Sequence, residues 1–172
     1  MASVAVRHLG LAGFTQSDGV GTAATPGNLK IWNVDLLAEK KFGFGVPTLE
    51  LAYYKYDLGA VDCGSGEPGS PACPGGGDNI GGQVDGKAYL AGLAWLIPGV
   101  VGWGQFQPYV RYQKYDRTLS NTTNKALDFG VNYVIKGPNA KISSQYTKFE
   151  DNRLPVAARE TKQFLIGAQL QY

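Results

Sequence analysis

The sequence predicts an all-β protein whose antiparallel strands form a transmembrane β-barrel, with eight strands in this chain. Polar and apolar residues alternate in segments of about ten residues, with the period of two that a β-strand requires. The connections between these segments are alternately short and long. Alternating segments of this length, joined by short turns at one end and long loops at the other, are typical of outer-membrane barrels.

The length of the chain predicts one domain, residues 1–172. Its composition has few charged residues. Charged residues make up 17% of the sequence, whereas an average soluble domain has about 25%. The net charge is +2, and no stretch forms the basic stripe of a nucleic-acid-binding protein. We therefore expect no nucleic acid among the partners.

The longest uncharged run, residues 88–110, has the length of a membrane-spanning helix. Pro98, Gly99, Gly102 and Pro108 interrupt it, and a helix tolerates such residues poorly. The run therefore predicts two strands and a turn.

Four strands are predicted in the first half of the chain, at about 3–14, 30–41, 48–58 and 87–97. In the second strand, apolar and polar side chains alternate cleanly between Trp32, Val34, Leu36 and Ala38 on one face and Asn33, Asp35 and Glu39 on the other. The third and fourth strands leave their parity open. For the fourth strand we favour an outward face of Tyr89, Leu93, Trp95 and Ile97.

Four more strands are predicted at about 105–117, 126–135, 141–147 and 163–172. The first of them opposes a face of Gln105, Gln107, Tyr109, Arg111 and Gln113 to one of Phe106, Val110 and Tyr112. A membrane barrel turns the apolar face to lipid and the polar face to the lumen. The predicted pore-lining residues are therefore Asp35, Glu39, Arg111, Gln113, Asp128, Lys141 and Gln145.

Two aromatic girdles are expected at the borders of the membrane. Trp95, Trp103, Phe106 and Tyr172 lie near the short turns, and Trp32, Tyr54, Tyr56, Tyr112 and Tyr146 lie toward the long loops. The short turns would be periplasmic, and an even number of strands places both termini on that side. A soluble lipid-binding barrel is the alternative, but it needs an apolar interior, which the Gln-rich strand faces would not provide.

The longest loop, at about 59–86, is expected to be external and contains Cys63 and Cys73. A disulfide between them is expected in an oxidising compartment, because two cysteines are too few for a structural zinc site and His8 is the only histidine. The Gly-rich loop lacks the Lys-Ser/Thr ending of a phosphate-binding loop. The sequence shows no nucleophile and base, so we expect no enzyme, no cofactor and no metal.

The segments FQPYVRYQKYDR, FGVNYVIKGPNAKISSQYTKFED and FLIGAQLQY resemble the last strands of bacterial porins of the phosphate-selective porin O and P type. The resemblance is clearest over residues 90–172. Because such porins are 16-stranded trimers, it implies that the chain corresponds to the C-terminal half of one. The eight strands are then either half of a 16-stranded porin or a small closed barrel.

The resemblance also implies a function and a location. It implies an outer-membrane porin of a Gram-negative bacterium, a passive channel for ions or small hydrophilic solutes, with small solutes or anions and outer-membrane lipid as partners. Partners would be a homotrimer or an additional barrel-completing chain. A terminal assembly signal is implied at Phe164, Ile166, Leu170 and Tyr172.

The charges of the inward positions bear on the selectivity of such a channel, and the number of strands leaves a second function open. The inward positions carry Arg7, Arg111 and Lys141 against Asp35, Glu39, Glu50 and Asp128, so their charges nearly cancel and we expect weak selectivity. The alternative function is a closed eight-stranded barrel that serves as a membrane anchor or surface-interaction protein, because side chains fill so small an interior.

Overall fold

The computed structural model describes residues 5–22, 25–57, 79–80, 83–118, 121–137 and 139–171. Its long strands are β1 (Ala5–Thr22), β2 (Thr25–Glu39), β3 (Val46–Asp57), β6 (Gly86–Leu96), β8 (Gly104–Arg117), β9 (Thr123–Lys136), β10 (Ala140–Asp151) and β11 (Glu160–Leu170). The short elements are β4 (Asn79–Ile80), β5 (Gln83–Val84), β7 (Val100–Val101) and a 3-10 helix, η1 (Val156–Ala158). Within the described ranges, no helix is long and apolar enough to cross a membrane.

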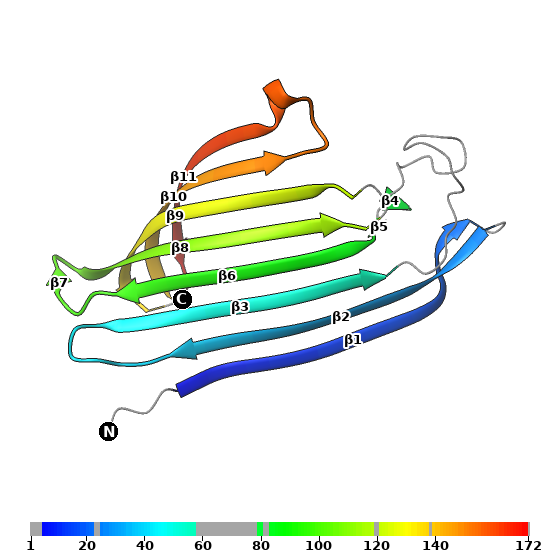
Figure 1. Cartoon of the computed structure of the whole chain (residues 1–172). Helices are drawn as coiled ribbons and strands as arrows, with labels where there is room; N and C mark the ends of the chain where they lie inside the picture. Colours follow the sequence, from blue (N-terminus) through cyan, green and yellow to red (C-terminus); the bar gives the residue numbers. More distant parts are fainter. Residues whose placement is uncertain are drawn as a thin grey trace.

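The long strands form one antiparallel sheet in the order β1-β2-β3-β6-β8-β9-β10-β11. β7 pairs with β8 as the ninth strand of this sheet, and β4 pairs with β5 in a separate two-stranded sheet. Each long strand pairs with the next long strand along the chain, so the sheet is a meander, and Figure 1 shows it as a single curved layer. The predicted all-β, antiparallel fold is confirmed.

Short connections gather at one edge of the layer. Residues 40–45, 97–103 and 137–139 connect strands there, and the first of these turns is closed by a hydrogen bond from the Phe42 amide to the Gly45 carbonyl, 2.8 Å long. β1 begins and β11 ends at this same edge (Figure 1). The connections between β3 and β6 and between β10 and β11 lie at the opposite edge, which we call the long-connection edge.

The sequence predicted the first two strands at about 3–14 and 30–41, but the polar and Gly-rich stretch between them is mostly strand where the structure describes it. β1 and β2 stay paired from Thr15 opposite Lys30 out to Thr22 opposite Thr25, with an irregularity between Gln16 and Val20. Main-chain pairing needs no apolar side chains, so an extended hairpin can form from residues whose alternation is weak. This expectation was wrong for that reason.

The sheet is not closed into a barrel. β1 and β11 are its two edges, and no pairing between them occurs in the described residues. Of the two arrangements left open by the sequence, a small closed eight-stranded barrel is therefore not the one that this sheet adopts. The interior of an eight-stranded barrel is just wide enough to be filled by side chains. The polar face of this sheet instead leaves a hollow of about 390 Å³, which is lined by large side chains such as Tyr109, Arg111 and Lys141.

In this sheet the apolar side chains are exposed and the most buried side chain is charged, which is the reverse of the pattern in a soluble protein. Leu29, 3% exposed, is the only buried hydrophobic residue in the described ranges, whereas Leu11 is 80% exposed and Ile166 is 70% exposed. The most buried side chain is an acid, Asp128, with 1% exposure. We call the two sides the apolar face and the polar face. The described residues form no apolar core between two layers.

Candidate functional site: the polar face of the sheet

All seven side chains predicted to line a pore lie on the polar face. Strand pairing aligns all of them except Lys141 in three neighbouring rows across the sheet. The rows are Glu39-Thr48-Ala94-Tyr109-Gly130-Gln145, Glu50-Gly92-Arg111-Asp128-Thr147 and Asp35-Ala52-Leu90-Gln113-Ala126. Lys141 lies two positions from Ser143 on the same face of β10. Residues of five strands line the same hollow, so this face is the concave one. A shared face is what the alternation predicted, while a role in a pore remains a prediction.

Asp128 is the centre of the polar network. Its carboxylate accepts hydrogen bonds from Arg111 Nε at 3.0 Å and Gln113 Nε2 at 3.0 Å, both on β8. From β10 it accepts bonds from Gln145 Nε2 at 3.1 Å and from the Thr147 hydroxyl at 2.7 Å. Four donors on one buried carboxylate satisfy it fully, so the network ties three neighbouring strands together.

Tyr109 and Gly130 extend this network by a close approach. The Tyr109 hydroxyl donates to Gln145 Oε1 at 2.9 Å across β9. A Cβ added to Gly130 would overlap the Tyr109 ring, so the ring can lie across β9 only because this position has no side chain. Gly130 is therefore required for the geometry of the Asp128 network.

One ion pair and one histidine–carboxylate contact lie at the other end of the sheet. Arg7 Nε lies 3.2 Å from Glu39 Oε2, and His8 Nε2 lies 2.7 Å from Asp35 Oδ2. A β-bulge between Val6 and His8 lets adjacent residues reach the same face, which strict alternation forbids. The sequence reasoning missed His8 for this reason. Asp35 and Glu39, both predicted to line a pore, each have a basic partner.

Two charged side chains in the hollow have no partner. Glu50 and Lys141 line it together with Arg111, Tyr109, Asn132 and Ser143. Within the described part of the chain, neither Glu50 nor Lys141 takes part in an ion pair or hydrogen bond. Asp128 pairs with Arg111, and no ion pair joins it to Lys141 within the described residues. Glu50 and Lys141 thus place one unpaired charge of each sign in the hollow, as far as the structure describes the chain.

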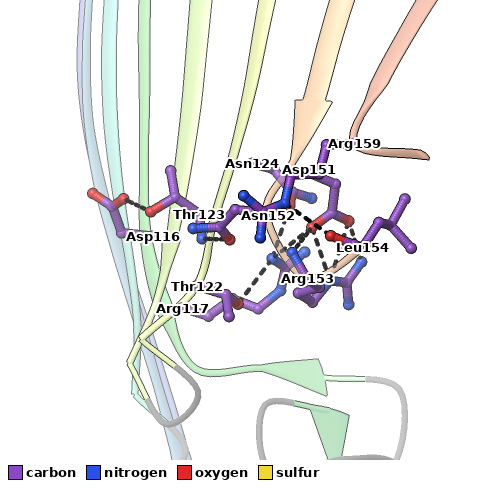
Figure 2. Close-up of polar contacts among 10 residues, drawn as sticks. All are labelled: Asp116, Arg117, Thr122, Thr123, Asn124, Asp151, Asn152, Arg153, Leu154 and Arg159. Carbon is purple, nitrogen blue, oxygen red and sulfur yellow. Dashed lines mark hydrogen bonds and ion pairs between the residues drawn. The ribbon is translucent and has the colours of Figure 1, made fainter. Parts of the chain in front are cut away.

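A second polar cluster closes the polar face at the long-connection edge. Figure 2 shows its residues, which come from the ends of β8, β9 and β10 and the connection after β10. Asp151 is 4% exposed, and its Oδ2 accepts a hydrogen bond of 2.7 Å from Arg153 Nη2. Its Oδ1 lies 3.9 Å from Arg117 Nη1. Arg117 also donates to Asn124 Oδ1 at 2.9 Å. The hydrogen bonds from Arg153 lower the pKa of the Asp151 carboxyl, which therefore stays ionised.

Aromatic residues border the apolar face at both edges. At the short-turn edge, Phe44 stacks on Trp95 with ring centroids 5.3 Å apart, and Phe106 lies 5.1 Å from Tyr133. At the long-connection edge, the rings of Trp32, Tyr53 and Tyr89 contact in a row, with centroid distances of 5.0 Å and 5.2 Å.

Two tyrosines were placed on the wrong side. Tyr54 and Tyr56 have the same parity as Glu50 in β3 and lie on the polar face, while Tyr53 lies on the apolar face. The expectation that Tyr54 and Tyr56 belong to a girdle was therefore wrong, because the alternation in β3 left the parity open. In β6, the favoured outward positions of Tyr89 and Leu93 agree with their exposure of 39% and 49%.

The predicted assembly signal lies on the apolar face of β11. Phe164, Ile166 and Leu170 are 63%, 70% and 76% exposed. Tyr172 lies outside the described residues, and so do Cys63 and Cys73 of the predicted disulfide.

Neither metal geometry nor comparison with known proteins adds a function. In the described ranges, no three His, Cys, Asp or Glu side chains come together as metal ligands would. No protein-family model, no curated protein and no solved structure matches the chain. The function must therefore be argued from the two faces of the sheet.

Proposed function

We propose that this chain is part of the wall of an outer-membrane porin, a passive and weakly selective channel for ions or small hydrophilic solutes. The observation that carries the proposal is a single curved sheet with an exposed apolar face and a continuous polar concave face. A sheet one layer thick is stable when lipid covers the apolar side and water fills the polar side. The resemblance of residues 90–172 to porins supports the same class.

The width of the apolar band supports a membrane-spanning position. On β9 the outward positions run from Leu127 to Ile135, which is about 27 Å along a strand at about 3.4 Å per residue. Strands of outer-membrane barrels tilt by about 40°, which reduces this height to about 20 Å, and their apolar bands are about 25 Å tall. Aromatic side chains border the band at both edges, as such barrels require.

The open edges indicate that more strands complete the channel. Unpaired main-chain groups in the bilayer core cost several kcal/mol each, so an open sheet edge is not stable in lipid. β1 and β11 therefore need partner strands, from further chain or from other copies. A completed barrel of about 16 strands leaves an aqueous channel, which eight strands do not.

Paired charges favour weak selectivity. Arg7 and Arg111 each lie against an acid on the polar face, so their fields cancel locally. Glu50 and Lys141 remain as one free charge of each sign in the hollow. Neither cations nor anions should be strongly preferred by such a wall.

Reversal potentials in planar bilayers under a salt gradient test this proposal. Lys141→Glu should shift the reversal potential toward cation selectivity, because it turns the hollow acidic. Lys125→Glu makes the same change of charge on the apolar face and should leave the potential unchanged. Absence of conductance from folded, monodisperse protein inserted in lipid would contradict the channel. Equal shifts in the two variants would show that the polar face does not line the path.

A further inference from the structure

A row of lysines follows the apolar face along the long-connection edge. Every long strand from β2 to β11 contributes one, namely Lys30, Lys55, Lys87, Lys114, Lys125, Lys148 and Lys162. On the apolar face, each lies two positions beyond the last large apolar or aromatic side chain of its strand, such as Trp32, Tyr89 or Phe164. We call this row the lysine collar. It lies where the apolar band ends.

The register places collar lysines directly opposite each other three times. The pairs are Lys55 with Lys87, Lys114 with Lys125, and Lys148 with Lys162. Like charges directly opposite in an antiparallel pair are destabilising. An anion between the two ammonium groups removes the repulsion.

One of these pairs shows how an anion is held. Glu160 bridges Lys148 and Lys162, with carboxylate oxygens 2.7 Å and 3.1 Å from the two ammonium nitrogens. In the second pair, Lys114 is neutralised by Asp116 at 2.7 Å. Two of the three pairs thus have a carboxylate of the chain itself beside them.

In the third pair, Lys55 with Lys87, aspartates lie nearby and Asp116 is opposite Lys87 in the register, but none forms an ion pair with either lysine in the described residues. Lys55 and Lys87 line a hollow of about 700 Å³ at the strand ends. Asp57, Asp85 and Asp116 also line it. Asp116 is already engaged by Lys114 and by the Thr123 hydroxyl at 2.8 Å, and Asp57 and Asp85 have contacts of their own. The Lys55–Lys87 pair is therefore open to an external anion.

We propose that the lysine collar, and the Lys55–Lys87 pair above all, binds the phosphate groups of lipids in the surrounding leaflet. This inference rests on the proposed function, because only a membrane-spanning sheet places the collar at headgroup level. Lysine stems lie along apolar surface while the ammonium group reaches the polar border. Phosphate oxygens form strong charge-assisted hydrogen bonds with ammonium groups, in the place that the Glu160 carboxylate takes in the Lys148–Lys162 pair.

Trp32 gives a direct reporter, because it is paired with Lys55 across β2 and β3. In a background with Trp95→Phe and Trp103→Phe, the protein is reconstituted into phosphatidylcholine vesicles that contain a small fraction of brominated lipid. Quenching of Trp32 is compared for brominated phosphatidic acid and brominated phosphatidylcholine. We expect phosphatidic acid to be enriched about fivefold at the collar, the usual effect of a lysine near an anionic surface. Raising the salt concentration should reduce the enrichment.

Matched variants locate the site. Lys55→Gln with Lys87→Gln should abolish the enrichment, whereas Lys40→Gln with Lys41→Gln, which removes two charges at the short-turn edge, should preserve it. Equal quenching by the two lipids in the parent protein would overturn the inference while leaving the channel proposal intact. Absence of quenching by brominated phosphatidylcholine would mean that the sheet is not in the bilayer, and both proposals would fall.

Discussion

The two faces of the sheet relate polarity to exposure in opposite ways. On the apolar face, Leu11 and Ile166 are 80% and 70% exposed. On the polar face, Asp128 is 1% exposed and accepts four hydrogen bonds from side chains of two strands. Because the sheet is curved, side chains on the concave polar face crowd together, whereas side chains on the convex apolar face spread apart.

This difference shows that the two faces are stabilised by different means. Burial of apolar area contributes roughly 25 cal/mol per Å², and in this sheet that contribution is available only from something outside the chain. The polar face, in contrast, is held by hydrogen bonds and ion pairs internal to the chain. Substitutions on the two faces should therefore have different costs, which the following predictions test from the largest effect to the smallest.

The largest effect is expected from a charge placed on the apolar face of β11. Leu165 and Ile166 are adjacent, similar in size and on opposite faces. Ile166→Arg should destabilise the protein in lipid vesicles by about 2–4 kcal/mol, the cost of a cation on the lipid side of a barrel. Leu165→Arg should cost much less. Urea titration of folding into vesicles, read by heat-modifiable gel mobility, measures both, and equal costs would contradict the assignment of the faces.

The next effect concerns the centre of the polar face. Asp128→Asn keeps the size of the side chain but removes the charge that Arg111 and three other donors bind. We expect a loss of about 2–3 kcal/mol, because hydrogen bonds to charged groups contribute about 1.5–3 kcal/mol. Thr147→Val, which removes a single donor, is the milder control. A change below 0.5 kcal/mol on the urea scale would show that the network does not hold the strands.

A smaller loss of stability is expected at the close contact between Gly130 and the Tyr109 ring. Gly130→Ala places a methyl group against the Tyr109 ring, and overpacking of this kind costs about 1–2 kcal/mol. Tyr109→Ala should remove the conflict, so that the double variant is no less stable than Tyr109→Ala alone. Additive losses in this double-mutant cycle would contradict the close approach.

The smallest effect is a pH dependence at the long-connection edge. Because hydrogen bonds from Arg153 hold the pKa of Asp151 below its ordinary value, the carboxylate contributes stability above the unfolded pKa of about 3.9. This contribution is lost as the pH falls through the lowered pKa of the folded protein. The stability difference between the parent protein and Asp151→Asn should thus be constant above about pH 5 and shrink at lower pH. A difference independent of pH down to pH 2 would contradict it.

Much of the fold followed from alternation, and the failures have identifiable causes. The strands of the second half were predicted to within a few residues because every second residue from Gln105 to Gln113 is polar or aromatic. Tyr54 and Tyr56 were misplaced because both faces of β3 carry aromatic residues. The pairing of His8 with Asp35 depends on a bulge that leaves no mark in the sequence.

By itself the sequence determined the strand period, the ends that carry short turns and the side of the sheet on which Asp35, Asp128 and Lys141 lie. These properties are local, since each depends on the identity of every second residue along one strand. The tertiary structure alone decided which charges pair, that Asp128 binds Arg111 and not Lys141, and that β1 and β11 remain edges. These properties depend on register, bulges and curvature, which arise between strands and not within them.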